Sequence, residues 1–124
     1  MTINNDYIIL GLSDGVLFCW HKPVIINLRI AKEIVQQRHD MSKGESYPCV
    51  VDIRDLGGVE MDAVNYFSSE KSSRNITAMA LIIKSSIVAN LANFYYKLFG
   101  SKIPTRLFSC ELQAKEWIKQ YNNG

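Results

Sequence analysis

The chain has 124 residues, of which 48% are hydrophobic and 21% are charged, and its formal net charge is +2 at pH 7. This length and composition are typical of a globular protein with a proper core, so we predict one domain over residues 1–124. The fourteen lysines and arginines are scattered without a basic run, which argues against nucleic acid as a partner and against a membrane surface recognised by charge.

No segment predicts secretion or membrane insertion. The first ten residues, MTINNDYIIL, lack the basic region of a signal peptide. The longest apolar-rich segment, residues 86–99, is shorter than a membrane span. Three cysteines stand far apart, at 19, 49 and 110, and no pair of them has metal-ligand spacing. We therefore expect reduced thiols in a cytoplasmic protein.

The chain begins with two strand-like runs, at 7–12 and 16–21. Asp14 and Gly15 lie between them and supply the positive φ angles that a tight hairpin needs. Pro23 ends the second run because proline has no N–H to donate to a sheet. We expect an N-terminal β-hairpin at the sheet edge.

The remaining chain alternates between strand and helix patterns. Largely apolar runs predict strands at 47–54 and 76–83, and the stretch TRLFS predicts a final strand at 105–109. Helical spacing predicts helices from the N-cap Asn27 to about Met41, over 60–70 and over 86–99. A last helix is predicted after the N-cap Ser109, and its buried face consists of Ala114, Trp117, Ile118 and Tyr121. The serine-rich stretch 68–75 is predicted to be an exposed connecting loop. This order predicts an α/β fold with a five-stranded, mixed, mostly parallel sheet and four helices.

Three stretches carry a resemblance to a known family: VVDIRDL at 50–56, ITAMALIIKSSIVANLANFYYKLFG at 76–100 and RLFSCELQAKEWI at 106–118. With the order of elements, they resemble STAS domains of the SpoIIAA type. They are closer still to small bacterial SpoIIAA-like proteins grouped with the lipid-binding CRAL-TRIO fold. The resemblance implies a STAS/SpoIIAA-like fold and a non-enzymatic interaction or regulatory module. The alternative that it implies is a carrier or sensor of a small apolar, lipid-like ligand.

The acidic stretch CVVDIRDLGGVEMD, at 49–62, suggests either a carboxylate site or an ordinary strand end. A metal or acid–base site needs side chains that converge, and Asp52 and Asp55 stand three apart across a strand end. We predict that Asp52 accepts loop N–H groups. Glu60 and Asp62 are expected in the first turn of the next helix, where negative charge offsets the helix dipole.

The same loop bears on regulation. In SpoIIAA-type antagonists it carries a serine that a partner kinase phosphorylates, but the matching residues here, GVEMDAV at 58–64, contain none. No Ser or Thr occurs from Arg54 through Phe67, so a phosphate would find no hydroxyl. This departure argues against the phosphoserine switch. A partner could still bind through this loop, which makes Asp55 and Glu60 candidate contact residues.

No candidate for catalysis has the partner that it needs, so we predict a protein that is not an enzyme, with no cofactor and no metal. Cys19 and His21 share one face of a strand, but the sequence places no third ligand beside them. Cys110 starts a helix without a basic neighbour in sequence. Lys84, Ser85 and Ser86 form either a weak anion site or an ordinary helix cap.

The segment 86–99 is apolar around more than half of its predicted helix, which is wider than a helix packed on a sheet requires. The excess predicts a contact surface at Ile87, Phe94 and Tyr96. Either a homodimer interface or the lip of an apolar ligand site would use such a surface, unless neighbouring helices cover it. The partners expected are therefore a protein, a second copy of the chain, or a small apolar ligand.

Overall fold

The computed structural model describes residues 2–84 and 103–122. Within these residues, six strands form one sheet in the order β1-β2-β3-β5-β7-β8. β1, β2 and β3 pair in antiparallel fashion, whereas β3, β5, β7 and β8 are parallel. The six strands are β1 (Thr2–Asn4), β2 (Ile8–Ser13), β3 (Val16–His21), β5 (Tyr47–Asp52), β7 (Ile76–Ile82) and β8 (Thr105–Phe108).

The predicted α/β class with a mixed sheet is confirmed, but the sheet has one strand more than the five predicted. The extra strand is β1, which pairs with β2 from Thr2 opposite Gly11 to Asn4 opposite Ile9. The predicted hairpin is present as β2 and β3, yet β1 takes the edge position that we expected for it. The sequence of β1, TIN, is too short and too polar for an alternating pattern to be recognised.

A second, two-stranded parallel sheet joins β4 (Ile25–Ile26) to β6 (Gly58–Val59). The Val24 carbonyl accepts the Gly57 N–H at 2.9 Å, and the Ile26 carbonyl accepts the Glu60 N–H at 2.9 Å. These bonds attach the segment after β3 to the acidic loop after β5. Two-residue strands carry no period that a sequence pattern could reveal, so this sheet was not predicted.

We expect Gly15 to be costly to substitute. Asp14 and Gly15 have φ angles of 52° and 76°, the two positive angles of a tight hairpin turn. A Cβ on Gly15 would lie 2.6 Å from Oδ1 of Asn122, whose Nδ2 donates to the Asp14 carbonyl. Gly15→Ala should therefore lower the free energy of unfolding by about 1–2 kcal/mol, measured by urea denaturation.

Gly44 provides a matched control for this prediction. It also has a positive φ, of 81°, but no atom of the described residues lies within 4 Å of where its Cβ would stand. Gly44→Ala should therefore lose only the conformational part of the free energy. If the two variants are equally destabilised, the contact between Gly15 and Asn122 does not matter.

The first helix, α1 (Leu28–Ser42), begins and ends as predicted. Asn27 is its N-cap, and the Asn27 Oδ1 accepts the Ile30 N–H at 2.9 Å. Lys43 ends the helix in the left-handed conformation, with a φ of 50°, and donates its N–H to the His39 carbonyl at 3.2 Å. The helix packs its apolar stripe against the sheet, and one charged residue, Arg38, lies on that stripe.

The helix predicted over 60–70 is interrupted, and the loop predicted at 68–75 contains a second helix. α2 (Met61–Phe67) is followed by α3 (Glu70–Ser73). Ser69 separates them because its hydroxyl donates to the Tyr66 carbonyl at 2.6 Å and accepts the Ser72 N–H at 3.3 Å. Ser72 is buried. The prediction of an exposed loop was therefore wrong at this point.

The last helix, α5 (Glu111–Ile118), continues into a 3-10 helix, η2 (Lys119–Tyr121). Its N-cap is Cys110 and not Ser109, because Cys110 has the extended backbone of a cap residue and its carbonyl accepts the Ala114 N–H at 3.2 Å. The Cys110 side chain makes no capping bond. Of the four residues predicted to form the buried face, Ala114 and Ile118 are buried and Trp117 and Tyr121 are half-buried.

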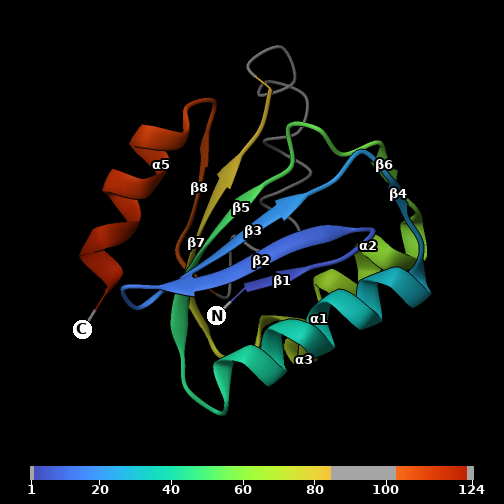
Figure 1. The fold of residues 1–124 in the computed structure, drawn as a ribbon, viewed down its shortest axis with the longest axis horizontal. Helices are drawn as coiled ribbons and strands as arrows, with labels where there is room; N and C mark the ends of the chain where they lie inside the picture. The colour runs from blue at the N-terminus through green and yellow to red at the C-terminus, as the bar shows by residue number, and fades with distance from the viewer. Residues whose placement is uncertain (1, 85–102, 123–124) are drawn as a thin grey trace.

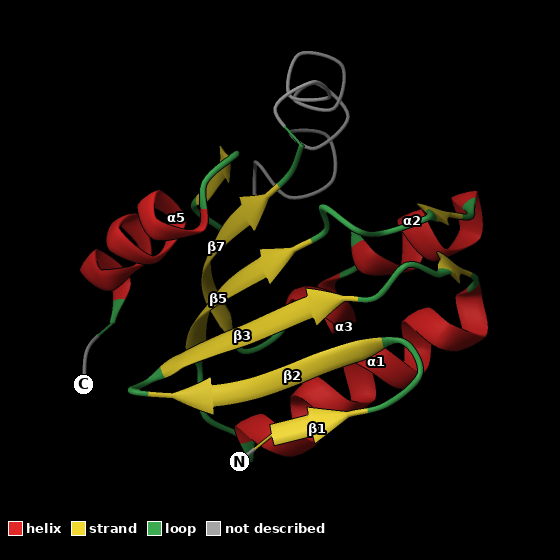
Figure 2. Cartoon of the chain, turned by 45° about the horizontal axis from the view of Figure 1, so that its top comes forward, coloured by secondary structure: helices red, strands yellow, loops and turns green. Residues whose placement is uncertain are grey.

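The helices cover both faces of the sheet and define two apolar cores. α1, α2 and α3 lie on one face, and α5 lies on the other (Figures 1 and 2). The first core, beneath α1, includes Leu10, Leu17, Ile34, Cys49 and Met79. The second core, beneath α5, includes Val50, Ala80, Ile82, Phe108 and Ile118. Because successive side chains of a strand point to opposite faces, β5 and β7 contribute to both cores.

The predicted helix at 86–99, with its contact residues Ile87, Phe94 and Tyr96, lies outside the described residues, as do Ser85 and Ser86 of the predicted anion site. Lys84, the remaining member of that site, is exposed shortly after β7. Among the described helices, none combines the length and the apolar character needed to cross a membrane.

Candidate functional site

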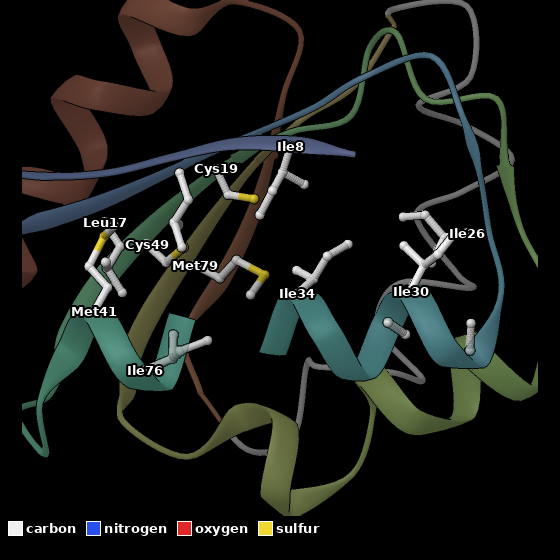
Figure 3. Close-up of a cluster of buried hydrophobic side chains, with 13 residues drawn as sticks. Ile8, Leu17, Cys19, Ile26, Ile30, Ile34, Met41, Cys49, Ile76 and Met79 are labelled. Atoms are coloured by element: carbon white, nitrogen blue, oxygen red, sulfur yellow. The ribbon is translucent and has the colours of Figure 1, made fainter. Parts of the chain in front are cut away.

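A cavity of about 360 Å³ lies between the sheet and the layer formed by α1, α2 and α3. Strands β2, β3, β5 and β7 supply one wall, and the three helices supply much of the other. The wall is mainly apolar, with residues such as Leu10, Ile34, Val51, Val64 and Leu81. In Figure 3, Cys19 and Met79 point from the sheet toward α1, and Ile34 points from α1 toward the sheet.

The alternation of strand side chains determines which residues reach the cavity. Cys19 and His21 stand two apart on β3 and therefore share the face toward α1, whereas Trp20 points to the other face. Leu10 lies opposite Cys19 on β2, so it joins the same face. The predicted shared face of Cys19 and His21 is confirmed, and both side chains are buried.

Arg38 is the only lysine or arginine among the described residues that line the cavity. It is 9% exposed and comes from the apolar stripe of α1, one turn after Ile34. Its Nη2 donates a short hydrogen bond to the Ser72 carbonyl at the end of α3. Burial lowers the pKa of Arg38, but a guanidinium stays protonated in proteins. The cavity therefore contains a fixed positive charge.

His21 is another buried polar residue of the wall. Its Nε2 lies 3.6 Å from the Cys19 Sγ, whereas its Nδ1 is buried and has no hydrogen-bond partner among the described residues. Burial lowers the pKa of His21 to about 4, although the nearby Asp52 charge acts in the opposite direction. The imidazole is therefore neutral at pH 7 and adds no charge to the cavity.

The two cysteines of the wall, Cys19 and Cys49, are free and buried. Burial raises the pKa of Cys49 to about 11 and raises the pKa of Cys19 still further above its ordinary value. Both thiols are therefore protonated at neutral pH, and a protonated thiol is a weak nucleophile. In this cavity they act as small apolar side chains.

The acidic loop forms local pairs on the other side of the sheet. Asp52 accepts the Arg54 N–H at 3.0 Å, as predicted, and also forms a salt bridge with the Arg54 guanidinium at 2.6 Å. Although burial acts against it, the bonds from Arg54 hold the pKa of Asp52 below its ordinary value. The Trp20 indole N–H donates to Asp55 at 3.1 Å. Each carboxylate thus has its own partner, and the two do not converge.

The other candidates stay apart. Glu60 is the N-cap of α2 rather than a first-turn residue, and it makes no side-chain capping bond. Asp62 does lie in the first turn, as predicted. His39 and Cys110 are half-buried on α1 and before α5. In the residues that the structure describes, no three His, Cys, Asp or Glu side chains gather in a way that could bind a metal ion.

Comparison with known proteins identifies the family of the chain and a solved structure with a similar fold. A family model described as a domain of unknown function (DUF7793) matches residues 10–122. The chain belongs to the DUF7793 family. A crystal structure of an uncharacterized DUF3478-family protein from Shewanella loihica PV-4, described as having a SpoIIAA-like fold, is similar with a TM-score of 0.67 and 15% identity. The similarity covers 95% of this chain and 98% of that one. No curated protein matches the chain.

The predicted SpoIIAA-like fold of this DUF7793 domain is confirmed, because the similarity to the DUF3478-family structure extends over nearly the whole of both chains. At this level of identity the similarity concerns the fold alone. It does not extend to membership of the STAS family or to a function. The function has to be argued from the residues of the domain itself.

The helical spacing placed Arg38 on the same face as the apolar residues of the first helix but assigned it no role, and the cavity was not predicted. The signal for Arg38 was present, because the helical spacing places a charged residue on the stripe formed by Ile30, Ile34 and Met41. A lysine or arginine at such a position is rarely buried without a partner. The cavity had no sequence signal, because its wall combines residues from nine separate helices and strands.

Proposed function

We propose that the protein binds a small apolar ligand in the cavity beneath α1, as a carrier or sensor, and performs no catalytic step. The observation that carries this proposal is the cavity itself, with about 360 Å³ between the sheet and three helices. Ligand sites typically have volumes of about 300–1,000 Å³, apolar walls and a few polar groups. Three buried polar side chains, Arg38, His21 and Ser72, supply such groups.

The absence of catalysis in this proposal follows from the chemistry of the wall. The thiols of Cys19 and Cys49 are protonated at neutral pH, and His21 contacts a thiol rather than a hydroxyl nucleophile. The described lining residues include no carboxylate that could orient the imidazole or act as a general base. Binding is the activity that these groups support.

A second candidate function is an interaction or regulatory module that resembles STAS domains without their phosphoserine. Ile25 and Met61 are both 65% exposed, and large apolar side chains that gather at a surface mark an interaction site. The pairing of β4 with β6 brings Ile25 close to the start of α2, where Met61 and the exposed Glu60 lie. A protein partner or a second copy of the chain would cover these residues.

Native mass spectrometry of the protein purified from its expression host tests the first proposal. We expect a monomer that retains an adduct of lipid size. Val51→Phe should weaken or abolish retention of the adduct, because Val51 is a half-buried residue of the cavity wall and the larger ring would narrow the space. Leu112→Phe is the matched control, because Leu112 is 74% exposed on α5 and lies away from the cavity.

A clean dimer mass without an adduct would instead support the interaction module. Titration of the delipidated protein with dodecanol, below its solubility limit, completes the test. Binding by the wild type and by Leu112→Phe, with weaker or no binding by Val51→Phe, is the result expected of a ligand cavity. A wild type that neither retains an adduct nor binds dodecanol would contradict the proposal.

A further inference from the structure

We infer that the ligand of this cavity is an amphipathic monoanion with a carboxylate head group, and that Arg38 binds the carboxylate. The inference rests on the proposed function and specifies the class of ligand. It starts from the position of Arg38, which lies on the apolar stripe of α1 and lines the cavity together with Ile34 and Cys49. A charged side chain on such a stripe requires an explanation.

The charge of Arg38 is not balanced within the described residues. No carboxylate is among the groups that act electrostatically on Arg38, and the neighbouring thiols of Cys19 and Cys49 are uncharged at neutral pH. No Asp or Glu of the described residues forms a salt bridge with it. A buried charge destabilises the folded protein unless it is paired. An anion bound beside Arg38 would therefore offset this cost.

A purely structural role accounts for only part of this arrangement. Arg38 donates one hydrogen bond to the carbonyl of Ser72, and a cation at the carboxyl end of α3 is favourable. A guanidinium, however, has five N–H donors, and this is the one side-chain hydrogen bond of Arg38 that the described residues provide. The planar fork of the remaining donors is suited to bidentate binding of a carboxylate.

The number of charges in the wall selects the class of anion. Arg38 and His21 are the only residues of the described wall that could carry a positive charge, and His21 is neutral at pH 7. One positive charge balances one carboxylate, whereas a phosphate monoester at pH 7 brings nearly two negative charges. The apolar residues of the wall would bury the hydrocarbon tail.

The test compares two probes of equal chain length, dodecanoate and dodecanol, by isothermal titration calorimetry at pH 7.5 and below their critical micelle concentration or solubility limit. The delipidated wild type should bind dodecanoate about tenfold to a hundredfold more tightly than dodecanol, as expected for a hydrogen bond to a charged group. Arg38→Gln should lose this preference, so that the two probes bind with similar affinity.

Arg38→Lys, which keeps the charge but not the fork, should retain part of the preference. Arg29→Gln is the matched control, because Arg29 is an exposed arginine of the same helix that pairs with Glu33. It should bind both probes as the wild type does. Dodecyl phosphate should bind the wild type more weakly than dodecanoate does. A higher affinity for dodecyl phosphate than for dodecanoate would overturn the assignment of the head group to a carboxylate.

The wild type alone decides between the inference and the proposed function, even if Arg38→Gln does not fold. Equal affinity of the wild type for dodecanoate and dodecanol would overturn the inference and leave the proposed function intact. Failure of both probes to bind would contradict the proposed function. A preference for dodecanoate that survives in a folded Arg38→Gln would mean that another group binds the carboxylate, and would also overturn the inference.

Discussion

Between pH 7 and pH 4, the wild-type protein is expected to lose on the order of 3 kcal/mol more of its free energy of unfolding than the variant His21→Gln. His21 is 6% exposed, and burial lowers its pKa from 6.5 to about 4. As the pH falls below 6.5, the unfolded chain binds a proton that the folded protein does not accept until about pH 4. Protonation therefore favours the unfolded chain in this window.

Urea denaturation at pH 7, 6, 5 and 4 measures this dependence for both proteins. The comparison uses the change with pH, so a constant loss of stability caused by the substitution does not affect it. His39→Gln is the control: burial also lowers the pKa of His39, but this residue is only half-buried and should account for a smaller share. Parallel pH curves for the wild type and His21→Gln would show that His21 titrates normally in the folded protein.

Ile82→Ala is expected to lower the free energy of unfolding by about 2–5 kcal/mol, because it removes a large side chain from a close-packed core. Ile82 is fully buried at the end of the interior strand β7, where it lies between Asp52 on β5 and Phe108 on β8. Its side chain belongs to the core beneath α5. The cavity lies on the opposite face of the sheet, so ligand binding by the folded variant should persist.

Urea denaturation and dodecanol titration of the same sample check both halves of this prediction. Ile25→Ala provides the control for stability, because Ile25 is 65% exposed and its loss should cost less than about 0.5 kcal/mol. A loss of stability in Ile82→Ala as small as that in Ile25→Ala would mean that the core beneath α5 contributes little. A folded Ile82→Ala that no longer binds dodecanol would show that the two faces are coupled.

Local chemistry in the sequence predicted the elements whose ends are encoded within a few residues. Asn27 and Lys43 mark the two ends of α1, and Asp14 with Gly15 marks the hairpin turn, because each acts through its own backbone or a bond to a near neighbour. The failures are also local. β1 is too short to show a period, and Ser69 breaks a helical pattern with hydrogen bonds that compete with those of a helix.

The sequence by itself determined the α/β class, the SpoIIAA-like order of elements and the face of β3 that carries Cys19 and His21, because hydrophobic period and strand alternation are properties of short segments. Only the tertiary structure decided what lies next to that face. The sheet order brings β2, β3, β5 and β7 side by side, and α1 then places Arg38 over them. A cavity and an unbalanced charge depend on residues far apart in the chain, so no local pattern could reveal them.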